Sequence, residues 1–154
     1  MVRYLRYLVM LMSAVMLVFW SSPPVDADAS RTAVITALQG NVSYLPAGQT
    51  QWLGAQVGTL LNEKDTVKTG DDSTCTVLFQ GMSDSTVDVR PNSVMELSTV
   101  SAGDNADDTE LGLNLGSILV KAEKLQGESE FEVRTPNSIV GIRGTQFEVN
   151  VTEL

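Results

Sequence analysis

The chain has 154 residues, and its 10 basic and 19 acidic side chains give a formal net charge of −9. This length suits one domain with its own core, and the negative charge repels phosphate backbones, so nucleic acid is not an expected partner. The absence of histidine removes Ser-His-Asp and Cys-His arrangements and the commonest zinc ligand, so we expect neither an enzyme nor a bound cofactor or metal.

Residues 1–29 have the pattern of an export signal. Arg3 and Arg6 precede an apolar run at residues 8–20, and small residues follow where signal peptidase would cleave. The run is shorter than the roughly 20 residues that span a bilayer as a helix. We therefore expect a helical signal segment, followed by a periplasmic or extracellular domain at residues 30–154. The alternative is an uncleaved leader, which would be the chain's only membrane contact.

After the leader, apolar residues recur with a period of two, which is typical of half-buried strands. Clear alternation is found at residues 74–79, 86–90, 111–115, 118–121, 130–134 and 147–151. Clusters rich in glycine, proline, asparagine and aspartate separate these runs and predict turns. The pattern predicts an all-β domain with helix confined to the leader, apart from a short helical turn at residues 121–126.

Two segments of the chain are similar to each other. Residues 79–94 and 125–139 share a Gln-Gly turn, a strand of the form apolar-acid-Val-Arg, and a Pro-Asn-Ser corner. A true repeat favours a layered β-solenoid or β-roll, in which strand-corner-strand units stack on one another. A chance similarity leaves an antiparallel sandwich as the alternative.

Three side chains between the leader and the middle of the chain are candidate sites. Trp52 follows a loop and is either an exposed platform for a sugar or partner, or a plug for the end of the core. Asp65 is expected to tie the turn before Val67. Cys75, the single cysteine, shares a strand face with Val77 and Phe79, which predicts a buried apolar role and not a nucleophile.

The acidic side chains offer two further hypotheses. The run from Asp104 to Glu110 could supply calcium ligands, but its spacing matches no calcium loop, so a solvated connection is favoured. Carboxylate pairs such as Asp84 with Asp88, or Glu128 with Glu130, are the arrangement that a glycosidase would need. No motif marks a cleft around them, and catalysis is the least favoured function.

Several phrases of the sequence fit one family together. They are an expected entry hairpin at Ala33–Val42, then Leu61–Gly70, Pro91–Leu97 and Leu113–Ile118, and finally Phe131–Pro136 and Gly141–Val149. The most specific is the Thr-Pro corner followed by Arg-Gly-Thr-x-Phe. Together they resemble the FecR domain, an extracytoplasmic β domain named after the iron-dicitrate sensor protein, over nearly all of the chain after the leader.

The resemblance implies a role in extracytoplasmic signalling. Classical members also carry a cytoplasmic anti-sigma region, but only residues 1–7 precede the leader here, so that function is not carried over. What the resemblance implies is an exported, non-enzymatic FecR-type binding or scaffold module whose partner is an envelope protein. The alternative is a carbohydrate- or cell-envelope-binding protein with Trp52 as its contact.

The sequence departs from the FecR pattern in ways that matter. Lys64 precedes Asp65 where the family has glycine, and residues 80–83 replace the usual Asp-Gly-Ser hairpin. The family also adds a last strand pair beyond Leu154. The strand at residues 147–151 should therefore expose an edge that pairs with a second copy or with following residues.

The corner of the Arg-Gly-Thr phrase is the most distinctive local feature. Gly144 can adopt a backbone conformation closed to other residues, and Thr145 can fix the corner by bonding a nearby backbone group. In this architectural interpretation, Arg143 satisfies buried carbonyl groups. The functional alternative is that Arg143 presents a carboxylate-binding fork to a partner.

Overall fold

The computed structural model describes residues 33–80, 85–102, 107–122, 129–142 and 146–152. Every regular element in these ranges is a strand, which confirms the all-β prediction; the leader lies outside them. The strands are β1 (Ala33–Gln39), β2 (Val42–Leu45), β3 (Leu53–Gly54), β4 (Leu60–Leu61), β5 (Thr66–Thr69), β6 (Thr74–Phe79), β7 (Ser85–Val89), β8 (Val94–Ala102), β9 (Asp107–Ala122), β10 (Glu130–Arg134), β11 (Ile139–Ile142) and β12 (Gln146–Val151). These ranges contain no helix that is long and apolar enough to cross a membrane.

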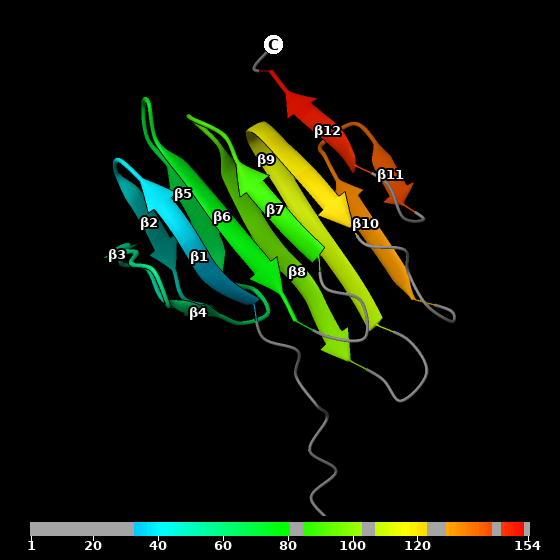
Figure 1. Cartoon of the computed structure of the whole chain (residues 1–154), viewed down its shortest axis with the longest axis horizontal. Coiled ribbons are helices and arrows are strands. Elements are labelled where there is room, and N and C mark those ends of the chain that lie inside the picture. The colour runs from blue at the N-terminus through cyan, green and yellow to red at the C-terminus, as the bar shows by residue number, and fades with distance from the viewer. Residues whose placement is uncertain (1–32, 81–84, 103–106, 123–128, 143–145, 153–154) are drawn as a thin grey trace, which may run out of the picture.

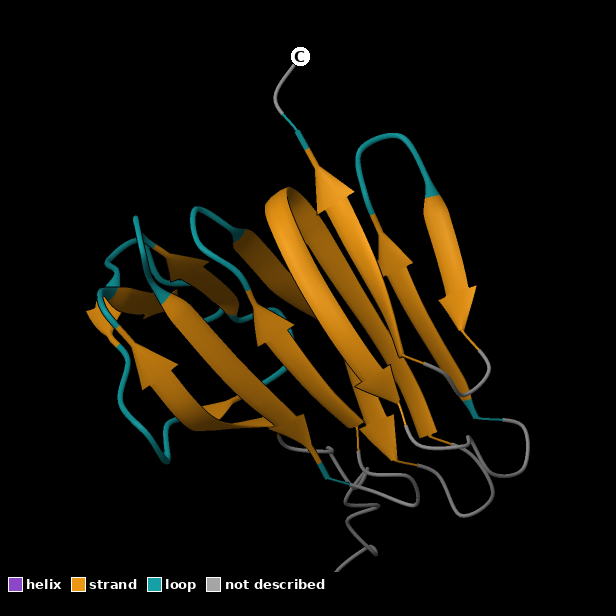
Figure 2. Ribbon diagram, turned by 45° about the horizontal axis from the view of Figure 1, so that its top comes forward, coloured by secondary structure: helices purple, strands orange, loops and turns teal. Residues whose placement is uncertain are grey.

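The described strands join into one twelve-stranded sheet that curls strongly into a half-barrel (Figure 1). One half has the order β3-β2-β5-β8-β9-β10-β11, and the other has the order β4-β1-β6-β7-β9-β12. The long strand β9 belongs to both halves, because residues 107–115 pair with β8 and residues 118–122 pair with β7. Neighbouring described strands are antiparallel, except that β10 runs parallel to β9. Figure 2 shows the halves curving around a common interior.

The interior is filled by the apolar residues of the period-two pattern. Cys75, Val77 and Phe79 of β6 are all fully buried, as their alternation predicts, and the thiol is free. Phe79 meets Phe131 of β10 edge to face, with ring centroids 6.2 Å apart and planes at 82°. Because β6 and β10 belong to opposite halves, this aromatic contact joins the two walls of the core.

Two details of the predicted strand layout are wrong. The glycine in Gly116-Ser117 suggests a turn between two strands, but β9 continues through it and bends there, with Gly116 at a φ of 86°. The expected entry hairpin does not exist either: β1 pairs with β4 and β6, whereas β2 pairs with β3 and β5. Residues 40–41 instead carry the chain from one half of the barrel to the other.

The chain changes halves at corners that stack on one another, at residues 40–41, 70–73, 90–93 and 116–117. Hydrogen bonds connect each corner to its neighbour. They run from the Asn41 N–H to Ser73 Oγ (2.9 Å), from the Asn92 N–H to the Gly70 carbonyl (3.2 Å), and from the Ser117 N–H to Ser93 Oγ (2.9 Å). Strand-corner-strand units therefore stack on one another, and most of the strands that become neighbours in this stack are antiparallel.

The two similar segments of the sequence fold differently at their corners. In the first, the Pro-Asn-Ser corner takes the chain from β7 in one half to β8 in the other. In the second, the corresponding corner folds β11 back onto β10 as an antiparallel hairpin within one half. The repeat thus predicts a strand and a corner at both places, but not where the following strand goes.

The two sides of the half-barrel end differently. On one side the segment between β3 and β4 bridges both halves, because the Ala55 N–H binds the Val42 carbonyl (2.9 Å) and the Gly58 N–H binds the Ile35 carbonyl (2.8 Å). On the other side β11 ends one half and β12 ends the other, and no described strand lies between them. Among the described residues, the sheet is therefore closed at one side and open at the other.

Candidate functional site

The strand β12 has an edge with no partner among the described strands. The Arg90 N–H binds the Ser117 carbonyl (2.9 Å), so Ser117 turns its backbone groups toward β7 and away from β12. In an antiparallel pair, two opposed residues either both direct their backbone N–H and C=O groups at each other or both direct them away. Asn150 is opposite Ser117, so its backbone groups also point away from β9. By alternation, the backbone N–H and C=O groups of Gln146, Glu148 and Asn150 point away from β9. Within the described residues, β12 therefore pairs with β9 alone.

The strand β11 has a similar edge. The Thr135 N–H binds the Ser138 carbonyl (2.8 Å) at the end of the β10–β11 hairpin, so these two residues face each other. Alternation along the hairpin then turns the backbone groups of Ile139 and Gly141 away from β10. In the part of the chain that the structure describes, β10 is the one strand that pairs with β11.

A cleft of about 520 Å³ lies between the edges of β11 and β12. Its apolar lining comes from Val140 and Ile142 of β11 and from Phe147 and Val149 of β12, and we call it the open-edge cleft. Ile142 and Val149 are 7% and 9% exposed, so the cleft reaches the margin of the core. Gly141 also lines an adjoining hollow of about 460 Å³ that extends along β10.

Acidic side chains surround this region. Glu148 of β12 lines the open-edge cleft, and Glu130 and Glu132 of β10 line the adjoining hollow. Neither hollow has a lysine or arginine among its described lining residues. Arg134, the nearby cation of β10, is engaged with Glu132 (3.4 Å) and with another carboxylate on β9 (3.0 Å). In the described part of the chain, the open side therefore combines an apolar floor with a rim of carboxylates, of which Glu148 also accepts a hydrogen bond from the Ser117 hydroxyl (2.9 Å).

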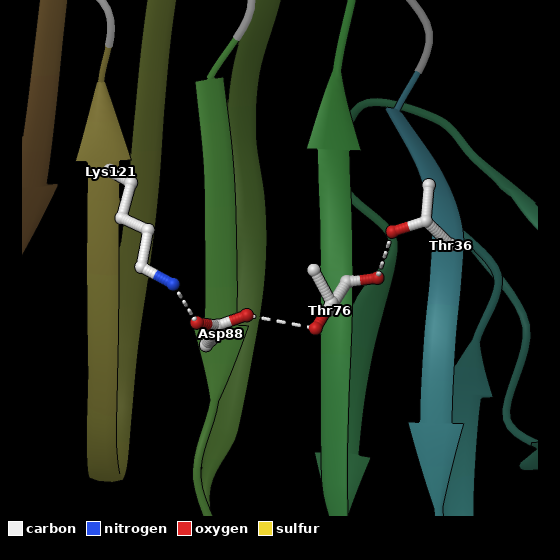
Figure 3. A network of polar contacts seen from close by, with 4 residues as sticks. All are labelled: Thr36, Thr76, Asp88 and Lys121. Carbon is white, nitrogen blue, oxygen red and sulfur yellow. Dashed lines mark hydrogen bonds and ion pairs between the residues drawn. The ribbon is translucent and has the colours of Figure 1, made fainter.

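A polar network crosses the outer face of the opposite half (Figure 3). Asp88 of β7 accepts hydrogen bonds from the Lys121 ammonium (2.8 Å) and from the Thr76 hydroxyl (2.8 Å), and the Thr36 hydroxyl binds the Thr76 carbonyl (3.3 Å). Burial alone would raise the pKa of Asp88. The hydrogen bonds from Lys121 and Thr76, with the charges of Lys121 and Arg90, outweigh it and hold this pKa below its ordinary value. The network ties four strands together.

Asp88→Asn is expected to remove a small, pH-dependent part of the stability. A lowered pKa means that the Asp88 carboxylate stabilises the fold above its ordinary pKa of 3.8 and loses this contribution as the pH falls through the folded-state value. Because Lys121 is about half exposed, the loss at neutral pH should stay below about 1 kcal/mol. Urea unfolding of parent and variant should differ at about pH 7 and converge at about pH 2.5. A difference that grows in acid would contradict this assignment.

Trp52 is found at the surface and does not plug the core. Its side chain is 40% exposed, next to Leu53 and at the closed side of the half-barrel. The Lys68 ammonium lies over the indole ring, 5.9 Å from its centroid, which is a cation–π contact. One face of the ring is therefore already occupied. The exposed Val57 lies between β3 and β4, and the exposed Leu60 is the first residue of β4.

Of the other residues that the sequence analysis singled out, two have the predicted roles and several lie outside the described ranges. Asp65 ties its turn as expected, because its carboxylate accepts the N–H groups of Ala47 (2.8 Å) and Asn62 (2.9 Å). Burial, with the charge of Asp88, raises the pKa of the Cys75 thiol to about 12, so it stays protonated. Arg143, Gly144 and Thr145 lie outside the described residues, as do Asp84, Asp104 and Glu128.

The acidic run behaves as part of a strand where it is described. Residues 107–110 belong to β9 and pair with β8, and Glu110 forms an ion pair with Arg134 (3.0 Å). The described residues contain no group of three or more cysteine, aspartate or glutamate side chains placed to share a metal ion. The open-edge cleft was not predicted as a site, although the alternation of Val140 and Ile142 was visible in the sequence.

Comparison with known proteins identifies the family. The model described as "FecR protein" matches residues 65–153, which is more than half of the 154-residue chain. The match includes β5 to β12 and thus both walls of the open-edge cleft. No curated protein and no solved structure matches the chain. FecR domains are non-catalytic sensor or regulatory domains, associated with signalling in a family of transmembrane sensors. The chain belongs to the FecR family.

Proposed function

We propose that this chain is an exported, non-enzymatic binding module for extracytoplasmic signalling, which recognises a partner protein at its open-edge cleft. The observation that carries the proposal is the asymmetry of the half-barrel. The chain closes one side with its own backbone, while the other side presents two strand edges and an apolar floor. Exposed apolar surface bordered by polar groups is the usual character of a protein-binding site. The export signal at residues 1–29 would place the domain in the periplasm or outside the cell.

Binding of a carbohydrate or another envelope component through Trp52 is the second candidate. The 40% exposure of Trp52 supports it, since sugars stack on exposed aromatic rings. The Lys68 ammonium over the same ring weighs against it, because a sugar would have to use the other face or displace the lysine. The two candidates place the contact on opposite sides of the half-barrel.

Site-specific photocrosslinking in cells distinguishes the two. A photoreactive residue replaces Ile139 at the open side or Val57 at the closed side, positions with similar exposure of 59% and 64%. We expect Ile139 to give one adduct of defined mass, which disappears when an excess of unlabelled chain competes. Val57 should give none. The proposal is wrong if Val57 alone crosslinks, or if the chain binds a glycan array and Trp52→Ala abolishes that binding.

A further inference from the structure

The free edge of β12 has the features of a template for one more strand. The backbone groups of Gln146, Glu148 and Asn150 point away from β9, and no described strand takes them up. Unpaired edges of this kind bind extended segments by main-chain hydrogen bonds, with pockets that receive alternate side chains. The inward side chains Phe147 and Val149 border the open-edge cleft and supply such a pocket.

The space between the two edges limits what can enter. Three residues connect the end of β11 to the start of β12, so at that end Ile142 and Gln146 lie at most about 14 Å apart, four steps of an extended chain. One added strand needs about 10 Å between its two neighbours, and two would need more than about 14 Å. At that end, therefore, the space between the two edges admits at most one added strand.

The charges around the cleft select the kind of segment. Glu148 lies beside the β12 edge, and Glu130 and Glu132 lie beside the adjoining hollow, with no described cation among the lining residues. The whole chain carries a net charge of −9, so a second copy would bring like charge to a negative rim. A segment with lysine or arginine at alternate positions would bring the opposite charge.

We infer that the open-edge cleft binds an extended segment of a partner protein, which adds to β12 as a strand and alternates apolar with basic side chains. The apolar side chains fill the space beside Val140 and Phe147, and the basic ones face Glu148. This inference rests on the proposed function and specifies how the partner is held. In this mode of binding, the alternating side chains of the segment determine which sequences bind, and its backbone hydrogen bonds to β12 supply most of the affinity.

A synthetic peptide tests the inference with the full chain. The probe is a blocked nine-residue peptide in which valines alternate with lysines and threonines, labelled for fluorescence anisotropy. It should bind one to one and slow the hydrogen exchange of the Gln146, Glu148 and Asn150 amides. Replacing its lysines with glutamates should weaken binding at least about 10-fold, since like charges then meet at the rim. Equal binding of the two peptides would overturn the inference.

Matched variants separate strand addition from other modes of binding. Asn150→Pro removes an outward N–H without touching a bond to β9 and should abolish binding, whereas Asn150→Ala should keep it within about threefold. Thermal melts check that both variants fold. If Asn150→Pro does not fold, a probe N-methylated at alternate residues serves the same purpose and should not bind. An N-methylated probe that binds like the parent probe excludes strand addition.

Two further outcomes would also overturn the inference, and they differ in meaning. If sedimentation shows a dimer that Asn150→Pro dissociates, the occupant of the edge is a second copy. If no peptide binds but the competed adduct at Ile139 is obtained, partner binding stands and strand addition fails. Absence of that adduct counts against the proposed function itself.

Discussion

Gly116→Ala is expected to lower the free energy of unfolding by about 3 kcal/mol, from left-handed strain together with overpacking. Gly116 has a φ of 86°, a conformation that costs other residues free energy. An added Cβ would also lie 2.6 Å from the Asn92 carbonyl oxygen and 2.6 Å from the Ser93 Cα, and nearer still to Ser93 Oγ. Two of these three atoms belong to the backbone of the neighbouring corner, so they cannot move aside cheaply. The stacked corners would have to separate where β9 passes between the halves.

Gly58→Ala provides the matched control for Gly116→Ala. Gly58 has nearly the same conformation, with a φ of 88°, but an added Cβ there meets nothing within 4 Å. Its substitution should therefore cost only the conformational part, about 1 kcal/mol. Urea unfolding of the two variants measures the difference. Equal losses would mean that the corners do not pack as tightly as this geometry requires.

The parts of the fold that could be predicted from sequence are those determined by local pattern. The burial of Cys75, Val77 and Phe79 follows from alternation within a single strand, which depends on no distant partner. The turn at Asp65 was predictable because a short acidic side chain commonly binds nearby backbone N–H groups. Each of these predictions concerns residues close together in the chain.

Lys64 shows why a family pattern can be kept while its usual residue is absent. It occupies the position where the FecR pattern has glycine, and it adopts a φ of 69°, in the left-handed region that glycine prefers. Its ammonium group also binds the carbonyl of Ser98, which anchors the side chain across the neighbouring strand. Lys64 therefore adopts a backbone conformation that favours glycine although it carries a side chain. The sequence alone showed the departure, and the structure supplies its physical meaning.

The open-edge cleft could not be predicted because it depends on distant pairings. Whether the backbone groups of Asn150 and Gly141 are paired is decided by where β9, β10 and β12 lie in the sheet. Gly116 also misled the sequence interpretation: a glycine followed by serine suggests a turn, but in this fold it bends a continuous strand. A site made of strand edges can be recognised only when the order of the strands in the sheet is known.

Phe131→Ala is expected to destabilise the fold at least as much as Gly116→Ala, by about 3–5 kcal/mol. Phe131 is 1% exposed and meets Phe79 edge to face across the core, so truncation removes both apolar burial and an aromatic pair. Phe131→Leu, which keeps most of the volume, should cost no more than about 1.5 kcal/mol.

The amides whose hydrogen exchange accelerates in Phe131→Ala show which part of the fold is destabilised. They distinguish loss of the contact between the two halves from a general loss of packing. The closed side is held by the bonds of Ala55 and Gly58 to both halves, whereas β10 and β11 have no such bridge in the described structure. Amide hydrogen exchange should therefore accelerate first at Val133 and Val140, while Ile35 stays protected until global unfolding. Equal acceleration at all three amides would show that the two sides open together and that Phe131 is not the particular link at the open side.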